Sequence, residues 1–438
     1  MPRKRIIIAG GGLAGLSCAW HLQRSNIDCH IFEKEKEPGG LCRSKDINSF
    51  TFDYDGHLLH FRHAYAFNLI KGLLGKNLAE HQRSAWICSF GRYTRYPFQA
   101  NLYGLPLPII KECLVGFIRA SKNGKHSAGK DGDFLSWINN TFGRGIARYF
   151  MVPYNSKFWT LPPQKITCAW LDGFIPVPSL QEVVDGTIEE NKRQFGYSAQ
   201  FWYPKKGGVS LVPLSLAASI KNIHTQREIT GIDIYNRQVE IAFRHREKYD
   251  YLITTLPLPQ MVSLIKEIPF KVKRLFGKLK WNSIFNLNLG IEKKDYSGRH
   301  WIYFPQKEFC FFRVGFFHNF SDYVCPEGKS ALYAEVSYSK QKPIDKKMIV
   351  SKIRKDLDEA GILAAKDRVC AEDVNDIEYG YPIYDKNYQR ARSEIIEYLR
   401  QYDIFTCGRY GSWKYMSMED ALLDGKNVAE RQIAPLIC

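Results

Sequence analysis

A glycine-rich turn near the N-terminus predicts a site that binds a dinucleotide. The turn reads Gly10-Gly-Gly12-Leu-Ala-Gly15 and lies between an apolar segment and a stretch with helical character. In such a turn Gly10 permits the tight bend, Gly12 lets the backbone approach a pyrophosphate, and Gly15 lets the helix pack close to the strand. Glu33 lies 21 residues beyond Gly12, where a carboxylate accepts hydrogen bonds from a ribose hydroxyl. The complete strand–turn–helix–strand unit, with the acid in register, therefore indicates a nucleotide cofactor.

The elements that position this cofactor come from both ends of the chain. An apolar segment at 403–407 enters another glycine turn and precedes a predicted helix at 417–431, which is again the pattern of a nucleotide-binding domain. A flavin dinucleotide is long enough to run from the first glycine turn to a contact near the C-terminus. This organisation favours a flavoprotein over a simple NAD dehydrogenase.

The predicted fold class is α/β, with a Rossmann-like FAD-binding domain, an inserted helical domain and an antiparallel β-sheet domain. Aromatic-rich segments from 285 to 338 predict antiparallel strands, and a helix is expected at about 347–360. The Gly- and Lys-rich stretch at 121–132 predicts an exposed loop. The domains are a discontinuous FAD-binding domain at 1–64, 200–265 and 400–438, a mainly helical domain at 65–185, and an antiparallel sheet domain for the substrate at 266–399.

The composition is that of a globular protein with a basic surface. The 438 residues include 62 Lys and Arg against 45 Asp and Glu, and the formal charge of +17 suits anionic ligands, nucleic acid or an acidic membrane surface. No dense basic block with interleaved aromatic residues occurs, so nucleic acid is not expected as a partner. Eleven cysteines without C-x-x-C pairs, together with the lack of a secretory signal, predict free thiols in a cytoplasmic protein without a metal site.

Apolar runs are too short to predict a transmembrane helix, because none reaches about 18 uncharged residues. Two shorter apolar segments, at 105–110 and 114–118, allow two interpretations. They could make peripheral contact with a membrane, or they could form a helix of the core, which is the commoner explanation. No heptad repeat separates an oligomer interface from the core, so the oligomeric state stays open.

Several motifs resemble one known family over nearly the whole chain. Four of them resemble the FAD-binding amine-oxidase superfamily, and within it the Gly-His loop and two further motifs are similar to UDP-galactopyranose mutases, especially the eukaryotic type. The first four are Gly39-Gly40-Leu-Cys-Arg43-Ser, Phe52-Asp53-Tyr-Asp-Gly56-His57-Leu-Leu-His60, Tyr203-Pro-Lys-Lys-Gly207-Gly208 and Asp250-Tyr-Leu-Ile-Thr-Thr-Leu-Pro257; the mutase-like pair are Tyr154-Asn155-Ser-Lys157-Phe-Trp159 and Gly408-Arg409-Tyr-Gly411-Ser-Trp413-Lys-Tyr415.

The reaction implied by this resemblance is the interconversion of pyranose and furanose forms of a nucleotide sugar. Reduced FAD attacks the anomeric carbon through N5 and displaces the nucleoside diphosphate, and the sugar then opens and closes again with the other ring size. The substrate is a nucleotide-diphosphate sugar, used for surface polysaccharide or glycoconjugate synthesis. NAD(P)H is left open as the electron donor, although the chain contains no second glycine-rich motif to bind it.

The resemblance assigns FAD to positions spread along the chain. His57 is expected to hydrogen-bond the edge of the flavin ring, with Gly56 allowing close approach. The alternative is a histidine satisfied in the core beside Leu58 and Leu59. The expected cofactor-binding residues are Gly10, Gly12, Leu13, Ala14, Gly15, Glu33, Lys34, Gly40, Leu41, Arg43, Gly56, His57, Ile229, Arg409 and Met418.

The expected catalytic residues are His57 and Arg313. Arg313 matches the family arginine that binds the leaving diphosphate, and its alternative role is a structural ion pair. Tyr381 and Tyr415 match tyrosines that contact the diphosphate. The expected contacts to the nucleotide base are Asn155, through its amide, and Trp159, through a stacking face.

Two positions depart from the family pattern. Phe174 stands where the family has a second diphosphate-binding arginine, and Phe320 replaces a tyrosine seven residues after Arg313. Phenylalanine cannot pair with phosphate, so both changes predict a less polar pocket, in which Phe174 still contacts the substrate. Three cations could replace the missing arginine as point charges: Lys157, Lys205 and Lys206.

Three functions remain after this comparison. The first is the flavin-dependent mutase. The second is an FAD-dependent oxidase or desaturase of the amine-oxidase superfamily that acts on a less charged substrate, and Phe174 with Phe320 favours it. The third is a flavin-binding protein without turnover, which only the missing arginine supports.

Overall fold

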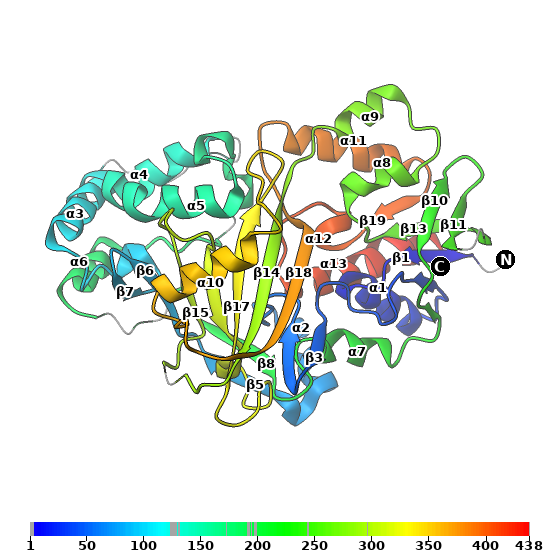
Figure 1. Ribbon diagram of the computed structural model, residues 1–438. Coiled ribbons are helices and arrows are strands. Elements are labelled where there is room, and N and C mark those ends of the chain that lie inside the picture. The colour runs from blue at the N-terminus through cyan, green and yellow to red at the C-terminus, as the bar shows by residue number, and fades with distance from the viewer. Residues whose placement is uncertain are drawn as a thin grey trace.

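The computed structural model describes residues 4–122, 129, 132–171, 173–190, 193, 195–196, 199–242, 245–295 and 297–437. Figure 1 shows a parallel sheet with its helices near both termini, a large sheet in the middle and a helical lobe at the far end. The predicted fold class, a Rossmann-like domain with inserted helical and sheet domains, is confirmed. Most of the loop expected at 121–132 lies outside the described residues.

A five-stranded parallel sheet gathers strands from three distant segments of the chain. Ile7 on the central strand pairs with Leu252 on one side and with His30 on the other. The apolar residues of that strand are buried, as expected when both faces of a parallel sheet are covered. The strands, in spatial order, are β19 (Ile404–Thr406), β13 (Tyr251–Thr254), β1 (Ile6–Ala9), β2 (His30–Phe32) and β9 (Ile223–His224).

Two helices from opposite ends of the chain pack against each other beside this sheet. They are α1 (Leu13–Arg24), which follows the glycine turn, and α13 (Met418–Asn427). Gly425 makes the contact close, because a Cβ there would overlap the carbonyl oxygen of Ala14. The C-terminal helix therefore holds the start of α1 in place.

The seven-stranded sheet forms the middle of the molecule and has two covered faces. Along β14, Ile284 faces the cavity described below, while Phe285 packs in the core under α10 (Ile349–Glu359). Ile349 and Ile353 are buried against that second face. The strand order is β18 (Val369–Pro382), β14 (Trp281–Ile291), β17 (Ser330–Tyr338), β16 (Arg313–Phe316), β15 (Trp301–Tyr303), β6 (Ala85–Ser89) and β7 (Arg92–Arg95).

The antiparallel strands predicted between 285 and 338 and the helix predicted near 347–360 are present. The segment expected to be mainly helical, 65–185, also contains strands. β6 and β7 form a hairpin within it, and β6 joins the sheet by pairing in parallel with β15. Four of the five β6 residues are buried and only Trp86 is half-buried, as expected for a strand that lies between two others in the sheet.

The helical lobe is held together by close contact between α3 (Leu107–Lys122) and α4 (Phe134–Ile146). Gly116 and Gly143 lie at this contact, and a Cβ on Gly143 would overlap the Gly116 backbone. The chain continues from α4 through a wide π-type turn into α5 (Val152–Trp159), which reaches the central sheet. Helix α5 of the lobe therefore forms part of the wall of the cavity described below.

The remaining elements connect these three parts. The small strands are β3 (Ser44–Ile47), β4 (Phe50–Asp53), β5 (Leu78–Gln82), β8 (Gln200–Pro204), β10 (Ile229–Asp233), β11 (Gln238–Ile241) and β12 (His245–Lys248), and the other helices are α2 (Ala64–Leu74), α6 (Leu180–Ile188), α7 (Leu211–Ala217), α8 (Met261–Leu264), α9 (Phe270–Phe276), α11 (Tyr388–Arg400) and α12 (Gly408–Gly411).

Candidate functional site

The glycine turn between β1 and α1 leaves a helix N-terminus open for an anion. Gly10 has a φ of +97°, which L side chains rarely adopt, and a Cβ on Gly15 would overlap the Gly10 carbonyl. Gly12 is the N-cap of α1. Among the described residues, no side chain caps this helix and no acidic residue lies in its first turn. The N–H groups of Leu13 and Ala14 are therefore available to a pyrophosphate.

Glu33 lies at the second position expected for the cofactor. Its buried carboxylate accepts hydrogen bonds from the Gly11 N–H at 2.7 Å and from the Glu35 N–H at 2.9 Å. These bonds tie the end of β2 to the glycine turn, and they place the carboxylate beside the turn where a ribose would lie. Lys34, the next residue, is exposed.

A second glycine pair completes the cradle. Gly40 approaches Gly12 so closely that a Cβ on Gly40 would lie 3.2 Å from the Gly12 Cα. Arg43 fixes this backbone, because its Nε donates to the Gly40 carbonyl at 2.8 Å. Ile229 is buried on β10 and does not line the cavity. An open helix N-terminus, a buried carboxylate beside the turn and the close approach of Gly12 and Gly40 fit the pyrophosphate end of FAD.

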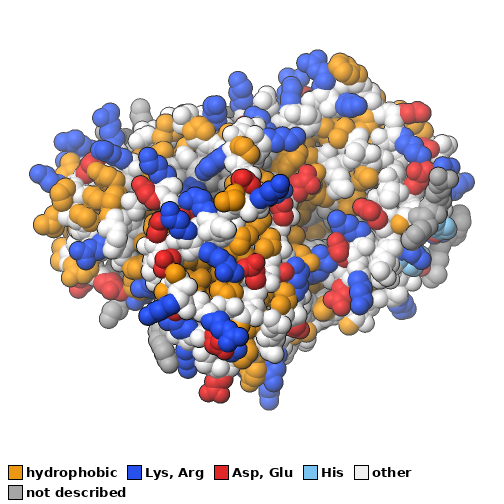
Figure 2. Space-filling view, in the orientation of Figure 1, with side chains coloured by type: hydrophobic (Ala, Val, Ile, Leu, Met, Phe, Trp, Pro, Cys, Tyr) orange, Lys and Arg blue, Asp and Glu red, His pale blue; other side chains and the backbone are white. Residues whose placement is uncertain are grey.

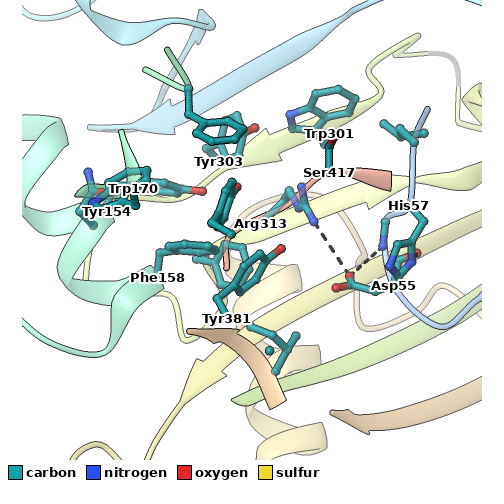
Figure 3. Close-up of a pocket in the computed structure, with 18 of the residues that line it drawn as sticks. Asp55, His57, Tyr154, Phe158, Trp170, Trp301, Tyr303, Arg313, Tyr381 and Ser417 are labelled. Atoms are coloured by element: carbon teal, nitrogen blue, oxygen red, sulfur yellow. Dashed lines mark hydrogen bonds and ion pairs between the residues drawn. The ribbon is translucent and has the colours of Figure 1, made fainter. Parts of the chain in front are cut away.

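A deep cavity lies where the three parts of the molecule meet. Five expected cofactor positions and most expected substrate positions line it, although they are spread along the sequence from Leu41 to Met418. Figure 3 shows Arg313 and Tyr381 facing the same space as Asp55 and His57. The predicted residues on its wall are Leu41, Gly56, His57, Asn155, Phe174, Arg313, Tyr381, Arg409, Tyr415 and Met418.

The loop that carries His57 is held by its own backbone and by a buried acid. The Asp53 carboxylate, two residues before Asp55, accepts hydrogen bonds from the Ser44 hydroxyl, the Tyr203 hydroxyl and the Val209 N–H at 2.7, 2.7 and 3.1 Å. Burial raises the pKa of Asp53 to about 7 in spite of these donors. These three hydrogen bonds to Asp53 therefore fix the start of the loop that carries His57.

His57 presents a neutral imidazole to the cavity. Burial lowers the pKa of His57, and the nearby Asp55 carboxylate only partly opposes this effect. Nδ1 lies 3.2 Å from the Asp55 carbonyl oxygen, so we assign the proton to Nδ1 and an acceptor to Nε2. Gly56 is needed here because a Cβ would overlap the Tyr333 hydroxyl, which is a different reason from the close approach to a flavin expected above.

Arg313 lies on the cavity wall and is also paired with carboxylates. Its NH2 group donates to Glu335 Oε1 at 2.8 Å, its Nε bonds the other oxygen of the same carboxylate, and Asp55 lies 4.0 Å away. Glu335 is fully buried, and burial raises the pKa of this carboxyl group, with the Arg313 charge opposing the shift. The structural ion pair considered for Arg313 exists, and the guanidinium nevertheless faces the cavity.

Aromatic side chains make up much of the remaining wall. Tyr381 and Tyr415 stack with ring centroids 5.5 Å apart, and Phe174 meets Tyr415 edge-on at 4.6 Å. Burial raises the pKa of both tyrosines, so their hydroxyls keep the proton and can donate to an anion. Arg409 lies 5.1 Å from the Tyr381 ring centroid, and its Nε donates to the Met416 carbonyl at 2.8 Å.

Trp159 is not where the prediction requires it. The side chain is fully buried, packs edge-on against Trp170 at 5.0 Å and does not line the cavity, so it offers no face to a nucleotide base. Trp170 lines the wall instead, and among the described residues its indole N–H has no acceptor. Asn155 does reach the wall, but its side-chain Nδ2 donates to the Met151 carbonyl at 2.8 Å.

The expectations for Phe320 and for the substitute lysines are also wrong. Phe320 is buried against Tyr203 at 5.6 Å, away from the cavity, so it does not change the polarity of the wall. Lys157 donates to four backbone carbonyls of the segment between β15 and β16, on the far side of α5. Lys205 and Lys206 are exposed and do not line the cavity.

Two acids of the site were missed at the sequence level. Asp55 is adjacent to the Gly-His pair that was identified, and its position alone could have indicated it. Glu335 lies in the apolar strand β17, where a carboxylate requires a partner; the only signal was that Arg313 has the same need on a neighbouring strand.

Two protein-family models match this chain. One, described as flavin containing amine oxidoreductase, matches residues 130–433, and the other, an NAD(P)-binding Rossmann-like domain, matches residues 8–73. A zeta-carotene-forming phytoene desaturase of Myxococcus xanthus is 38% identical over 50 residues, covering 11% of this chain and 10% of that protein. A hydroxysqualene dehydroxylase of Sinorhizobium fredii is 32% identical over 75 residues, covering 17% and 18%. The matches span only 10% to 53% of the curated relatives' lengths.

Solved structures match over almost the full length. A reduced UDP-galactopyranose mutase superimposes with a TM-score of 0.91 and 26% identity, covering 98% of this chain and 95% of that one. A putative protoporphyrinogen oxidase from Exiguobacterium gives a TM-score of 0.75 at 16% identity, covering 98% of both chains. A putrescine oxidase gives 0.71 at 13% identity, covering 97% and 98%. The last two share the fold.

Proposed function

Because this chain belongs to the flavin-containing amine oxidoreductase family, we propose that it is an FAD enzyme that interconverts the pyranose and furanose forms of a nucleotide-diphosphate sugar. The observation that carries this proposal is the full-length similarity to a UDP-galactopyranose mutase, at a TM-score of 0.91 and 26% identity. The oxidases that share the fold reach at most 0.75 and 16% among those compared above.

FAD would be held along the Rossmann-like domain. The N–H groups at the start of α1 and the Gly40 backbone would bind its pyrophosphate, and Glu33 its ribose. Leu41, Arg409 and Met418 would surround the ring where they line the cavity. Bound in its reduced form, FAD would supply a nucleophilic ring nitrogen for the anomeric carbon. NAD(P)H is the reductant we propose.

Donors on the cavity wall would bind the diphosphate as it leaves the sugar. The hydroxyls of Tyr381 and Tyr415 keep their protons, and both tyrosines line the same cavity as Arg313. Charge that develops on the departing phosphate oxygen is stabilised by such fixed donors. The neutral His57, next to the Asp55 that lies 4.0 Å from Arg313, would accept a hydrogen bond through Nε2 in the same space.

A second candidate is an FAD-dependent oxidoreductase that acts on a less charged substrate. The observation that favours it is the Arg313–Glu335 pair, since a guanidinium whose Nε and Nη2 groups both bond one carboxylate has less capacity for a diphosphate. Phe174, on the wall beside Tyr415, adds apolar surface where a cation would be expected. The names of two curated relatives, a phytoene desaturase and a hydroxysqualene dehydroxylase, are those of enzymes with apolar substrates.

The two candidates predict different products. The dithionite-reduced FAD-loaded protein is incubated anaerobically with UDP-galactopyranose, a GDP-hexose and a dTDP-hexose, and the products are separated and identified by NMR. The mutase predicts a nucleotide furanose from one of them with no net consumption of electrons. In a parallel aerobic incubation of the protein with oxidised FAD and a polyene or amine, stoichiometric peroxide formed from O2 as the substrate is oxidised, with no furanose from any nucleotide sugar in the anaerobic assay, would support the oxidoreductase instead. Tyr381→Phe removes one proposed donor to the diphosphate and should slow furanose formation in a folded protein.

A further inference from the structure

We propose that the outer face of the helical lobe docks on the surface of an anionic lipid bilayer. This face, here called the α3–α6 face, is defined by exposed apolar and basic side chains of the lobe. None of the described helices is long and apolar enough to cross a bilayer, so the contact is with the surface. Its residues are Tyr103, Leu107, Lys111, Val115, Arg119, Lys122, Arg144, Val177, Leu180 and Ile188.

Helix α3 is apolar on two sides, which a helix at the rim of a globular domain does not require. Its inner side buries Ile109, Cys113 and Phe117, at the spacing of one helix face. On the outer side Leu107 is 79% exposed and Val115 is 37% exposed. The sequence left two interpretations for these segments, a core helix or a membrane contact, and the helix has one face suited to each.

Exposed apolar side chains are concentrated on this lobe. Among the described residues, thirteen large hydrophobic side chains are exposed, and six of them lie between Tyr103 and Ile188. Helices α3 and α6, which carry four of the six, contact each other, and the N–H groups of Leu102 and Tyr103, just before α3, both donate to the Gly186 carbonyl of α6 at 2.8 Å. Figure 2 shows this end of the molecule with hydrophobic side chains interspersed with Lys and Arg.

The charges on the α3 side of this surface match an anionic partner, whereas on the α6 side Asp185 and Glu189 are exposed. Lys111, Arg119, Lys122 and Arg144 are exposed, and none of them makes an ion pair with a described residue. Unpaired cations next to exposed leucine and valine are the composition of helices that lie in a lipid–water interface. Anionic headgroups attract each such cation, and the apolar side chains add burial in the acyl boundary. Docking is independent of the reaction proposed above.

The test is flotation of the FAD-loaded protein with vesicles of phosphatidylcholine containing 30% phosphatidylglycerol, against vesicles of phosphatidylcholine alone. Binding to the anionic vesicles is expected, with a loss of at least tenfold in K111E/R119E/K122E and at least fivefold in L107S/V115S. A matched control is K271E/K273E/R274E on α9, which reverses the same number of exposed charges beside the exposed Phe270 and should change binding less than twofold.

Three results would overturn the proposal. The first is that the wild type does not float with anionic vesicles. The second is that the α9 variant loses as much binding as the α3 variant, which would indicate attraction by net charge alone. The third is that L107S/V115S converts an oligomer into a monomer in light scattering while lipid binding is unchanged, which makes the face an interface between copies. Circular dichroism and thermal melting establish that each variant is folded, since the substituted side chains are exposed.

Discussion

Replacing Glu335 with glutamine tests whether Arg313 meets a diphosphate in this cavity. In the wild type both oxygens of the Glu335 carboxylate accept hydrogen bonds from the Arg313 guanidinium, with 2.8 Å between Arg313 Nη2 and Glu335 Oε1. A phosphate bound to the free side of the guanidinium would lie about 7 Å from that carboxylate, and at an effective dielectric constant of about 20 two unit charges at this distance repel by about 2 kcal/mol. Removing the charge should therefore tighten nucleotide binding by about 30-fold.

The measurement is the dissociation constant of UDP for the FAD-loaded protein, by calorimetry or fluorescence titration. Glutamine keeps one acceptor for Arg313, so the variant should stay folded, which urea unfolding verifies. The gain should disappear in the double variant Arg313→Ala/Glu335→Gln. Asp356→Asn is the matched control, because it removes a carboxylate that is also almost fully buried, on α10 and away from the cavity. Unchanged or weaker UDP binding in a folded Glu335→Gln would refute the role of Arg313 as a phosphate ligand.

Three further changes follow from particular contacts. Phe174→Arg restores a cation beside Tyr415 and should tighten UDP binding by about 1.5–3 kcal/mol, whereas no gain would mean that phosphate does not pass this point. Lys157→Met leaves four backbone carbonyls without their donor and should lower the free energy of unfolding by about 2–4 kcal/mol in urea denaturation; a loss below about 0.5 kcal/mol would show that the segment does not depend on this side chain. Burial lowers the pKa of His300 to about 4, below the unfolded value of 6.5, so its contribution to stability is present above about pH 6.5 and is lost as the pH falls toward 4. His300→Gln should therefore reduce the difference in unfolding free energy between pH 7 and pH 4.5 by about 2.5 kcal/mol, and parallel pH dependences in the two proteins would contradict the assignment.

The nucleotide-binding part of the fold could be predicted because its physics is local. Gly10, Gly15 and Glu33 each have a role that follows from their residue type and spacing, and the structure places all three at the predicted turn. Helix α10 and the long strands could also be predicted from local sequence, because α10 buries residues at helical spacing and β14 and β17 are rich in apolar side chains. The hairpin of β6 and β7 was missed because its partner strand, β15, lies more than 200 residues away and no local pattern specifies it.

The candidate site was predictable only in part, because partners across the sheet decide which side chains reach the cavity. Trp159 and Phe320 have the residue types of a binding site, yet tertiary packing buries both away from it. Glu335, in contrast, belongs to the site although it lies in an apolar strand. Its role becomes clear only in the structure, where β16 places Arg313 beside it. Lys157 belongs to the mutase-like motif, but its ammonium group serves the backbone and not a ligand.

The most direct test of the proposed reaction is positional isotope exchange. UDP-galactopyranose labelled with oxygen-18 between the anomeric carbon and the β-phosphate is incubated with the FAD-loaded protein, and the label is followed by phosphorus NMR. Cleavage and re-formation of the anomeric C–O bond predicts that the label moves to non-bridging positions with reduced FAD and stays in place with oxidised FAD. A label that stays in place with reduced FAD, for this substrate and for the GDP- and dTDP-hexoses, would contradict the mutase.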